Sequence, residues 1–443
     1  MTPAAAESSY APDAEVVQLT SELIRIDTSN YGTEPGPGER VAAERVADLL
    51  DEVGIDSLLY EAAPNRTSLV ATWAPDGVDT SVPPLLVHAH LDVVPANAAD
   101  WQLDPFAGEI KDGCVWGRGA VDMKDFDAML LSVVRARARA GAAPRRPIRM
   151  IFTADEEAGG LLGAQWLVDH HPEHIADCTE AIGEVGGFSL TVRDDLRLYL
   201  IQTAEKGMNW LRLVAAGTAG HGSMRNSDNA VTELAGAVAR IGSYRWPDRI
   251  TASQKAFLDA LSEALDVDLD PDTVEETLRR LGSISRMVGA TMSNTANPTM
   301  LQAGYKHNVI PGQATAAIDG RTVPGGEAEF FATIRELIGD KISYQSLVDL
   351  PAVETEFAGA LVEAMQRSLV AEDPQAKAVP YLMSGGTDAK AWSRLGVRCF
   401  GFAPLKLPPE LDFVGMFHGI DERVPTESLE FGARVLDRFL AIA

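Results

Sequence analysis

The chain has 443 residues, more than one hydrophobic core usually supports, so we expect two domains. Its hydrophobic fraction of 46% is ordinary for a globular protein, and its net charge of −26 disfavours nucleic acid and anionic membranes as partners. Apolar runs are too short to cross a bilayer, no signal-peptide pattern is evident, and Cys114, Cys178 and Cys399 imply no disulfide framework, so a cytoplasmic location is expected.

In the first part of the chain, the strongest signal is one apolar strand that ends in histidines and an aspartate. Apolar spacing and turn residues predict a frayed tail, two helices and a short strand, at residues 1–13, 14–26, 39–53 and 68–73. An apolar run at 85–87 then leads into His88, His90 and Asp92. Side chains at i and i+2 of a strand share a face, so Asp92 can fix the tautomer of a metal-ligating His90. The alternative is that His90 and Asp92 are simply two hydrogen-bonded polar residues at a strand end, with no metal.

Two further strands also end in acidic residues. The strand predicted at 147–153 runs into Asp155, Glu156 and Glu157, and the one at 180–182 ends at Glu184. Helices predicted at 126–140 and 161–168 alternate with these strands, which indicates a mostly parallel sheet with ligands outside the carboxyl ends of its strands. For residues 155–157 taken alone, a solvated helix N-terminus is the simpler interpretation.

The acids and histidines form a set that two cations require. Asp122 lies in the loop after the central strand, and His418 comes late in the chain. Two cations held by protein need a bridging carboxylate, imidazoles and further carboxylates, and catalysis needs a nearby proton acceptor. Because Glu156 and Glu157 are neighbours, one can bind metal while the other acts as the base. The set predicts a dinuclear metal site.

The middle of the chain has a different pattern of apolar residues, because its predicted strands alternate between apolar and polar residues. Strands are predicted at 196–202, 209–215, 291–302 and 313–318, and helices at 229–241 and 252–264. We expect residues 203–322 to form an inserted smaller α/β domain. Residues 1–202 and 323–443 would then form one discontinuous catalytic domain. Its later elements are helices at 328–338, 356–370 and 427–441 and a strand at 397–402.

Motifs along nearly the whole chain resemble one family. The chain is similar to the zinc-dependent family of aminoacylase, acetylornithine deacetylase, succinyl-diaminopimelate desuccinylase and glutamate carboxypeptidase. The matching segments are HAHLDVVP (88–95), GRGAVDMK (117–124), TADEEAGG (153–160), GEVGG (183–187), GTAGHGS (217–223), HNVIPGQATAAIDGRTVPG (307–325), SGGTDAK (384–390) and MFHGIDERV (416–424). The resemblance implies a zinc-peptidase-like α/β catalytic domain with an inserted lid and dimerisation domain.

The resemblance also assigns roles at the metal centre. One zinc ion would be held by His90, Asp122 and Glu184, and a second by Asp122, Glu157 and His418. Co²⁺ or Mn²⁺ would be possible substitutes. Glu156 would be the general base that later protonates the leaving amine, and Asp92 would orient His90. A cis peptide bond between Asp122 and Met123 is a further expectation.

Residues of the inserted domain are assigned by the same resemblance. His221 would reach the active site of a second copy and polarise the scissile carbonyl, which implies a homodimer joined through that domain. Substrate would be contacted by Asn308, by Arg321 as a carboxylate ligand, and by a backbone-donor loop of Gly385, Gly386 and Thr387. Asp388 is interpreted as structural.

Several residues depart from the family pattern or invite another interpretation. Arg225 stands where the family usually has proline, and Asp125 where glycine often follows the DMK motif. His88 and His307 are interpreted as strand residues, with His88 at most behind the ligands. His170, His171 and His174 resemble a metal cluster, but their place at a helix end favours a solvated terminus.

The form DMK at 122–124 favours hydrolysis of N-acyl-amino acids, with a dipeptidase or carboxypeptidase as the alternative. A non-catalytic binding protein on the same scaffold is the remote alternative. No Gly-x-Ser-x-Gly motif supports a serine hydrolase. The expected partner is therefore a small molecule, an N-acyl-amino acid or a short peptide.

Overall fold

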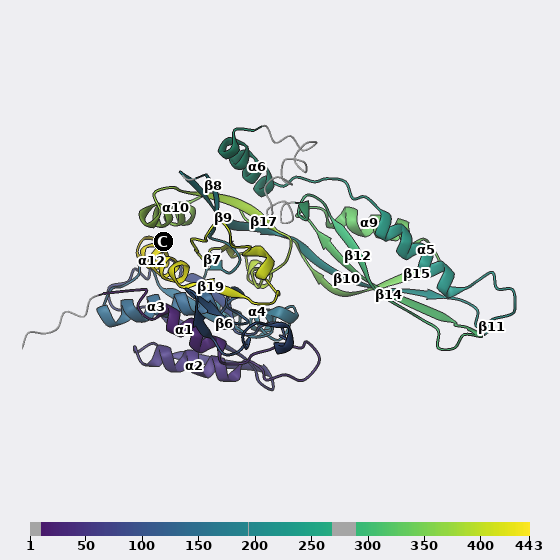
Figure 1. Cartoon of the computed structure of the whole chain (residues 1–443), viewed down its shortest axis with the longest axis horizontal. Helices are drawn as coiled ribbons and strands as arrows, with labels where there is room; N and C mark the ends of the chain where they lie inside the picture. Colours follow the sequence, from purple (N-terminus) through teal and green to yellow (C-terminus); the bar gives the residue numbers. More distant parts are fainter. Residues whose placement is uncertain (1–9, 194, 268–288) are drawn as a thin grey trace, which may run out of the picture.

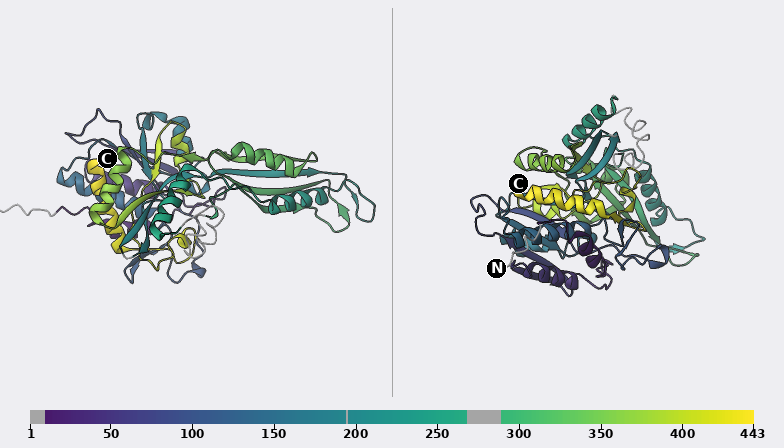
Figure 2. Two further views of the ribbon diagram at one scale, coloured as in Figure 1. Left: turned by 90° about the horizontal axis from the view of Figure 1, so that it is seen from above. Right: turned by 60° about the vertical axis from the view of Figure 1, so that its left-hand side comes forward.

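The computed structural model describes residues 10–193, 195–267 and 289–443. A rounded unit containing a large sheet continues into an extended arm built on a smaller sheet (Figures 1 and 2). The expected frayed tail lies outside the described residues up to residue 9, but its last residues are held to the body. The Tyr10 hydroxyl donates to Asp437, and Arg434 lies 2.7 Å from Asp13.

Ten strands of the described chain form the large sheet. They are β1 (Ser57–Ala63), β2 (Arg66–Trp73), β3 (Leu85–His90), β6 (Ile148–Thr153), β7 (Glu180–Gly183), β8 (Phe188–Arg193), β9 (Leu196–Glu205), β16 (Val353–Glu354), β17 (Ala376–Met383) and β18 (Arg398–Gly401). The order is β1-β2-β6-β3-β7-β18-β9-β16, with β8 and β17 also paired to β9. The central strands β6, β3, β7 and β18 run parallel, which confirms the predicted sheet.

Helices cover both faces of this sheet. Leu85 and Val87 of β3 face a core shared with α1 (Val16–Ile24), α2 (Arg40–Asp51), α3 (Lys124–Ala140), α10 (Ala360–Glu372) and α12 (Thr426–Ile442). Leu86 faces the opposite core, shared with α4 (Ala164–His170) and α11 (Ala389–Ser393). The strand is apolar on both faces because both are buried. No helix among the described residues is long and apolar enough to cross a membrane.

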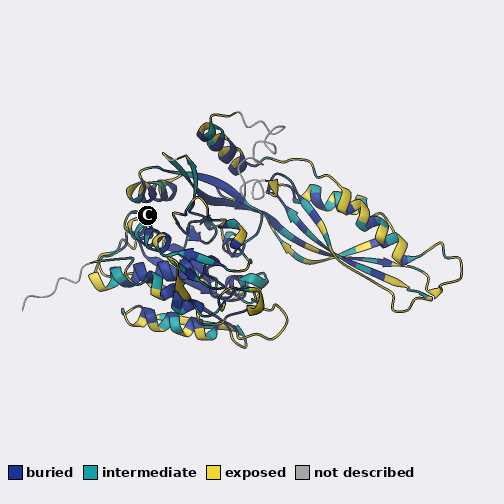
Figure 3. Ribbon diagram, viewed as in Figure 1, coloured by how far each residue is buried: buried dark blue, intermediate teal, exposed yellow. Residues whose placement is uncertain are grey.

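The arm is an antiparallel sheet with one covered face. Its strands are ordered β12 (Thr295–Ala303), β14 (Gln313–Thr322), β10 (Gly207–Ala216) and β15 (Ile342–Leu350). Leu211, Leu213 and Ala215 of β10 pack under α5 (Ala230–Ser243) and α9 (Glu327–Ile338), while the alternate residues remain more exposed (Figure 3). At the far tip, β11 (Gly220–His221) pairs with β13 (Val309–Ile310) (Figure 1).

The elements of the arm differ from the range 203–322 expected for the inserted domain. Strand β15 pairs with β10, and Ile334 and Ile338 of α9 are buried in the arm's core, so this sheet and its helices continue to Leu350. Helix α6 (Ala252–Leu265) lies within the expected range, yet its Phe257 and Leu261 belong to the large core. Apolar spacing shows that such helices are amphipathic but not which sheet they cover.

Short elements complete the large unit. The sheet β19 (Arg423–Pro425), β5 (Cys114–Trp116) and β4 (Glu109–Lys111) joins the C-terminal segment to the loop after β3. The 3-10 turns are η1 (Ala98–Asp100), η2 (Glu156–Ala158), η3 (Pro172–His174) and η4 (Val414–Met416). Buried Glu422 accepts hydrogen bonds from the backbone N–H of Val121, at 2.7 Å, and from Arg118, at 2.6 Å. These bonds bring the C-terminal turn of His418 beside the loop of Asp122.

Candidate metal centre

The parallel register brings three strand ends together. Thr153 of β6 pairs with His90 at the end of β3, and Ile182 of β7 pairs with Val87. Glu184 follows β7 directly, and η2 follows β6. Their side chains therefore meet at one edge of the sheet, where parallel α/β folds bind ligands.

Two loops complete the group. Asp122 lies just before α3 and forms a cis peptide bond with Met123, as expected. His418 follows η4 with a φ of 57°, a left-handed conformation that is uncommon outside glycine and turns its ring toward the strand ends.

The candidate ligands form two clusters that share Asp122. His90 Nε2 lies 3.1 Å from Asp122 Oδ1 and 3.4 Å from Glu184 Oε2. His418 Nε2 lies 3.3 Å from the other oxygen of Asp122 and 3.0 Å from Glu157 Oε2. The structure thus assembles both sets that the sequence proposed, His90-Asp122-Glu184 and Asp122-Glu157-His418. One carboxylate faces both histidines, as a bridging ligand must.

These separations suit tetrahedral cations. Metal–ligand bonds of about 2.0–2.1 Å at tetrahedral angles place ligand atoms roughly 3.3 Å apart. Within the described residues, Oε1 of Glu157 is buried without a hydrogen-bond partner, so a cation would satisfy an oxygen that the chain itself leaves unpaired. A set of imidazole nitrogens and carboxylate oxygens fits two divalent ions such as zinc.

The charges of the centre are arranged around Asp122. Burial alone would raise the pKa of this carboxyl, but hydrogen bonds from His418 and His90 hold it well below its usual range. Hydrogen bonds to Asp122 and Glu157 raise the pKa of His418 to about 10, and burial raises the pKa of Glu184 to about 8. Cations that bind here therefore displace protons.

Glu156 stands beside the clusters without joining either. Its Oε2 is 3.9 Å from His90 Nε2, and its side chain lines the adjoining cavity. Burial, followed by the charge of Glu184, raises the pKa of Glu156 well above its usual value. A carboxyl group with a raised pKa next to a ligand cavity is suited to accept and return a proton.

Asp92 contacts the ring of His90, and it also holds the loop of Glu156 and Glu157, a role that the sequence did not predict. The ring Nδ1 of His90 lies 2.9 Å from the backbone carbonyl of Asp92, whereas the nearer carboxylate oxygen is 3.6 Å away. The carboxylate also accepts hydrogen bonds from the backbone N–H groups of Glu156 and Glu157, each at 3.1 Å. Asp92 therefore orients His90 through its main chain and holds the loop of Glu156 and Glu157 through its side chain.

Asn30 is a residue that sequence reasoning missed. Its side-chain amide donates to Asp92 Oδ2 at 2.8 Å and to Asp155 Oδ1 at 3.2 Å, and its carbonyl accepts from Arg66 at 2.7 Å. Arg66 in turn contacts buried Glu39. An asparagine in a Gly/Pro-rich loop carries no sequence signal of this role, because Asp92 and Asp155 lie more than sixty residues away and Arg66 lies 36 residues away.

A cavity of about 490 Å³ adjoins the centre and contains some of the predicted substrate residues. Arg321, Gly385, Gly386 and Thr387 line it. Arg321 is already engaged through Nε with Asp319 Oδ1, at 2.8 Å. The backbone N–H and the hydroxyl of Thr387 donate to buried Glu205, at 2.8 and 3.0 Å. The expectation that Thr387 donates to the substrate is therefore wrong, because both of its donors are already used.

His221 and Asn308 are separated from this cavity. Both lie at the tip of the arm, where the backbone N–H of Gly222 donates to the Asn308 carbonyl at 2.9 Å (Figure 1). His221 is exposed, and its Nδ1 is 2.8 Å from the Ser223 hydroxyl. Neither residue is among those that line the cavity of its own chain.

The remaining residues that the sequence singled out lie outside the two clusters, and His307 lies in a turn before β13 and not in the strand that was expected. The His88 ring faces Trp392 and packs so closely on Gly183 that a Cβ there would lie 2.2 Å from it. Asp388 accepts the Thr153 hydroxyl at 2.5 Å. Asp125 is buried in the first turn of α3, while Arg225 and His307 are exposed on the arm.

Comparisons with known proteins agree with this geometry. The model of peptidase family M20/M25/M40 matches residues 86–442. The chain belongs to this family. It is 27% identical to aminoacylase-1 of Sus scrofa over 92% of this chain and 90% of that protein. It is also 27% identical to the N-fatty-acyl-amino acid synthase/hydrolase PM20D1 of Xenopus tropicalis, over 94% of this chain and 83% of that one.

A solved structure gives the same fold assignment. The M20 family metallo-carboxypeptidase Sso-CP2 from Sulfolobus solfataricus aligns with a TM-score of 0.73 at 17% identity, covering 97% of this chain and 99% of that one. The resemblance inferred from the motifs is thus confirmed, and the chain is a metal-dependent hydrolase of the M20 family. Its substrate, its metal, its cellular location and its oligomeric state remain predictions.

Replacing Asn30 with alanine tests the support of the loop. Asn30→Ala removes the amide that links Asp92 to Asp155, and we expect kcat or metal affinity to fall by about 10–100-fold, as for other residues that orient ligands. The control is Ser29→Ala, whose buried hydroxyl has no partner among the described residues. Equal activity of the two variants, both folded by circular dichroism, would contradict the role of Asn30.

Proposed function

We propose that the chain hydrolyses the amide bond of N-acyl-amino acids with the aid of two zinc ions. His90, Asp122 and Glu184 would hold one ion, and Asp122, Glu157 and His418 the other. The paired distances to the two oxygens of Asp122 and the buried, unpartnered Oε1 of Glu157 support these assignments. Co²⁺ and Mn²⁺, which accept the same ligands, would be substitutes.

The observation that favours an acylated amino acid is the lining of the cavity. Beside the centre, its wall is largely apolar, with Phe188, Met208, Trp210, Leu350, Met383 and Phe417. An acyl chain can bury its surface there, at about 25 cal/mol per Å². Arg321 lies in the same wall, where Asp319 accepts from its Nε at 2.8 Å and from its Nη2 at 3.4 Å. Its remaining terminal nitrogen, Nη1, would pair with the carboxylate of the amino acid.

The chain's own groups supply the proton transfers. The bound ions would supply Lewis acidity that polarises the carbonyl group and lowers the pKa of water. Glu156 would take the proton of the attacking water on a carboxylate oxygen and later deliver it to the departing nitrogen. The loop of Gly385 and Gly386 would orient the substrate carboxylate, and the apolar wall would exclude bulk water.

A homodimer is part of this proposal. His221 and Asn308 sit at the tip of the arm, outside the cavity of their own chain. If two copies pair with twofold symmetry, each arm can bring its tip to the other copy's cavity. His221 would then donate a hydrogen bond to the oxyanion that forms during hydrolysis.

A substrate panel tests the proposed reaction. The purified metal-loaded protein is offered N-acetyl-, N-octanoyl- and N-lauroyl-amino acids beside dipeptides of the same amino acids, and the released amine is measured. We expect kcat/KM to be higher for the acylated substrates and to rise with acyl length, because the cavity wall is apolar. Faster cleavage of dipeptides would support the dipeptidase alternative instead.

Replacing Glu156 with glutamine tests the base. Glu156→Gln keeps the shape of the side chain but cannot take up a proton, so kcat should fall by about 10²–10⁴-fold while the bound metal is unchanged. Glu410→Gln, at an exposed position, serves as the control. Retained turnover in a Glu156→Gln variant with its full metal content would exclude this role.

Mixing two inactive variants tests the transfer of His221 between copies. In a random mixture of His221→Ala and Glu156→Gln chains, a symmetric dimer would recover one intact site in each mixed pair, on the order of a quarter of wild-type activity. Each variant alone should remain inactive. If the mixture stays as inactive as its components although mass spectrometry detects mixed dimers, His221 does not act on the site of the other copy.

A further inference from the structure

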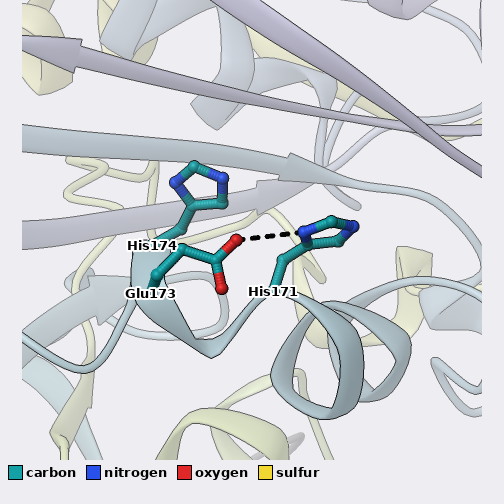
Figure 4. A group of neighbouring side chains, drawn as sticks. All are labelled: His171, Glu173 and His174. Atoms are coloured by element: carbon teal, nitrogen blue, oxygen red, sulfur yellow. Dashed lines mark hydrogen bonds and ion pairs between the residues drawn. The ribbon is translucent and has the colours of Figure 1, made fainter.

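A second group of metal-ligand side chains lies outside the candidate centre. His171, Glu173 and His174 follow helix α4, and they offer one ligand atom each within 4.8 Å of one another. Nδ1 of His171 lies 3.1 Å from Glu173 Oε1 (Figure 4). This distance is close to the roughly 3.3 Å that a tetrahedral ion imposes on two of its ligands.

The backbone of this segment is held in place. Pro172 begins the 3-10 turn η3, and the backbone N–H of Ala176 donates to the Pro172 carbonyl at 2.8 Å. Arg149 donates to the carbonyl of His174 and lies 3.2 Å from Asp177. The ligands are therefore presented by a constrained turn and not by a fraying helix end.

The two imidazole rings are also held. Tyr60 of β1 packs on the His171 ring, with centroids 4.2 Å apart, and its hydroxyl lies 2.6 Å from Nε2 of His174. Hydrogen-bonding partners of this kind fix the rings of metal-ligating histidines.

The three histidines, expected from the sequence to form a solvated helix terminus, differ in their surroundings. His170 alone fits that expectation, since it is exposed, stacked on Trp166 and bonded to that residue's carbonyl. His171 and His174 are half-buried. A sequence pattern cannot show this difference, because Tyr60 lies more than a hundred residues away.

We propose that His171, Glu173 and His174 bind one divalent transition-metal ion of the zinc class, separately from the catalytic centre. Two imidazole nitrogens and one carboxylate oxygen suit zinc, nickel or copper and not calcium or magnesium, which take oxygen ligands. The site lies toward the start of β6, beside Arg149, whereas the candidate centre lies beyond Thr153 at its other end. A bound ion would cross-link residues of the turn that follows α4.

Metal counting tests this proposal. Wild-type protein, the double variant His171→Ala/His174→Ala and the control His170→Ala are stripped with a chelator, reloaded with Zn²⁺, passed through a desalting column and analysed by plasma mass spectrometry. The double variant should hold one equivalent fewer than wild type, and His170→Ala should hold the same number as wild type. The difference does not depend on how many ions the catalytic centre takes.

A milder variant guards against misfolding of the double variant. Glu173→Gln changes an exposed side chain, and it should weaken the affinity for this one equivalent about tenfold in a calorimetric titration with Zn²⁺. The proposal is overturned if wild type and the double variant hold equal metal, if His170→Ala also loses an equivalent, or if Glu173→Gln titrates like wild type.

Discussion

The candidate site depends on one buried carboxylate that two histidines approach from opposite sides. Asp122 offers one oxygen to His90 and the other to His418, at 3.1 and 3.3 Å. Without cations, the charge of Asp122 is balanced by these two imidazoles, which explains its depressed pKa. The flanking acids Glu184 and Glu157 have raised pKa values, because burial and the charge of Asp122 both disfavour their ionised forms.

Around that carboxylate, the chain uses buried polar groups as supports. Asp92 accepts the two backbone N–H groups that position Glu156 and Glu157, and Asn30 joins Asp92 to Asp155 and Arg66. Glu205 does the same for the segment after β17, where it accepts from Thr387 and lies 3.2 Å from Lys390. Such networks are costly to bury unless satisfied, and here they hold loops at fixed positions.

Sequence reasoning recovered the strand ends because the cue is local. An apolar run that ends in His90 or in Glu156 and Glu157 is visible without knowing the fold. What it missed depends on distant pairing. Strand β15 joins the arm only through β10, and β17 contains Pro380, which is tolerated because β17 pairs on one side alone, with β9, among the described strands. The roles of Asn30, Thr387 and Tyr60 likewise appear only once their partners are folded beside them.

The order in which the ligands occur along the chain has a consequence for biosynthesis. His90 lies in the third strand, whereas His418 follows the last strand of the large sheet in the sequence. The segment of His418 is held in place by the hydrogen bond between Arg118 and Glu422. Until that segment emerges from the ribosome, the acids around Asp122 lack one of the two imidazoles that offset their charge. The set Asp122-Glu157-His418 is therefore completed last, and a chain interrupted before residue 418 would keep buried carboxylates at this sheet edge without one of their imidazole partners.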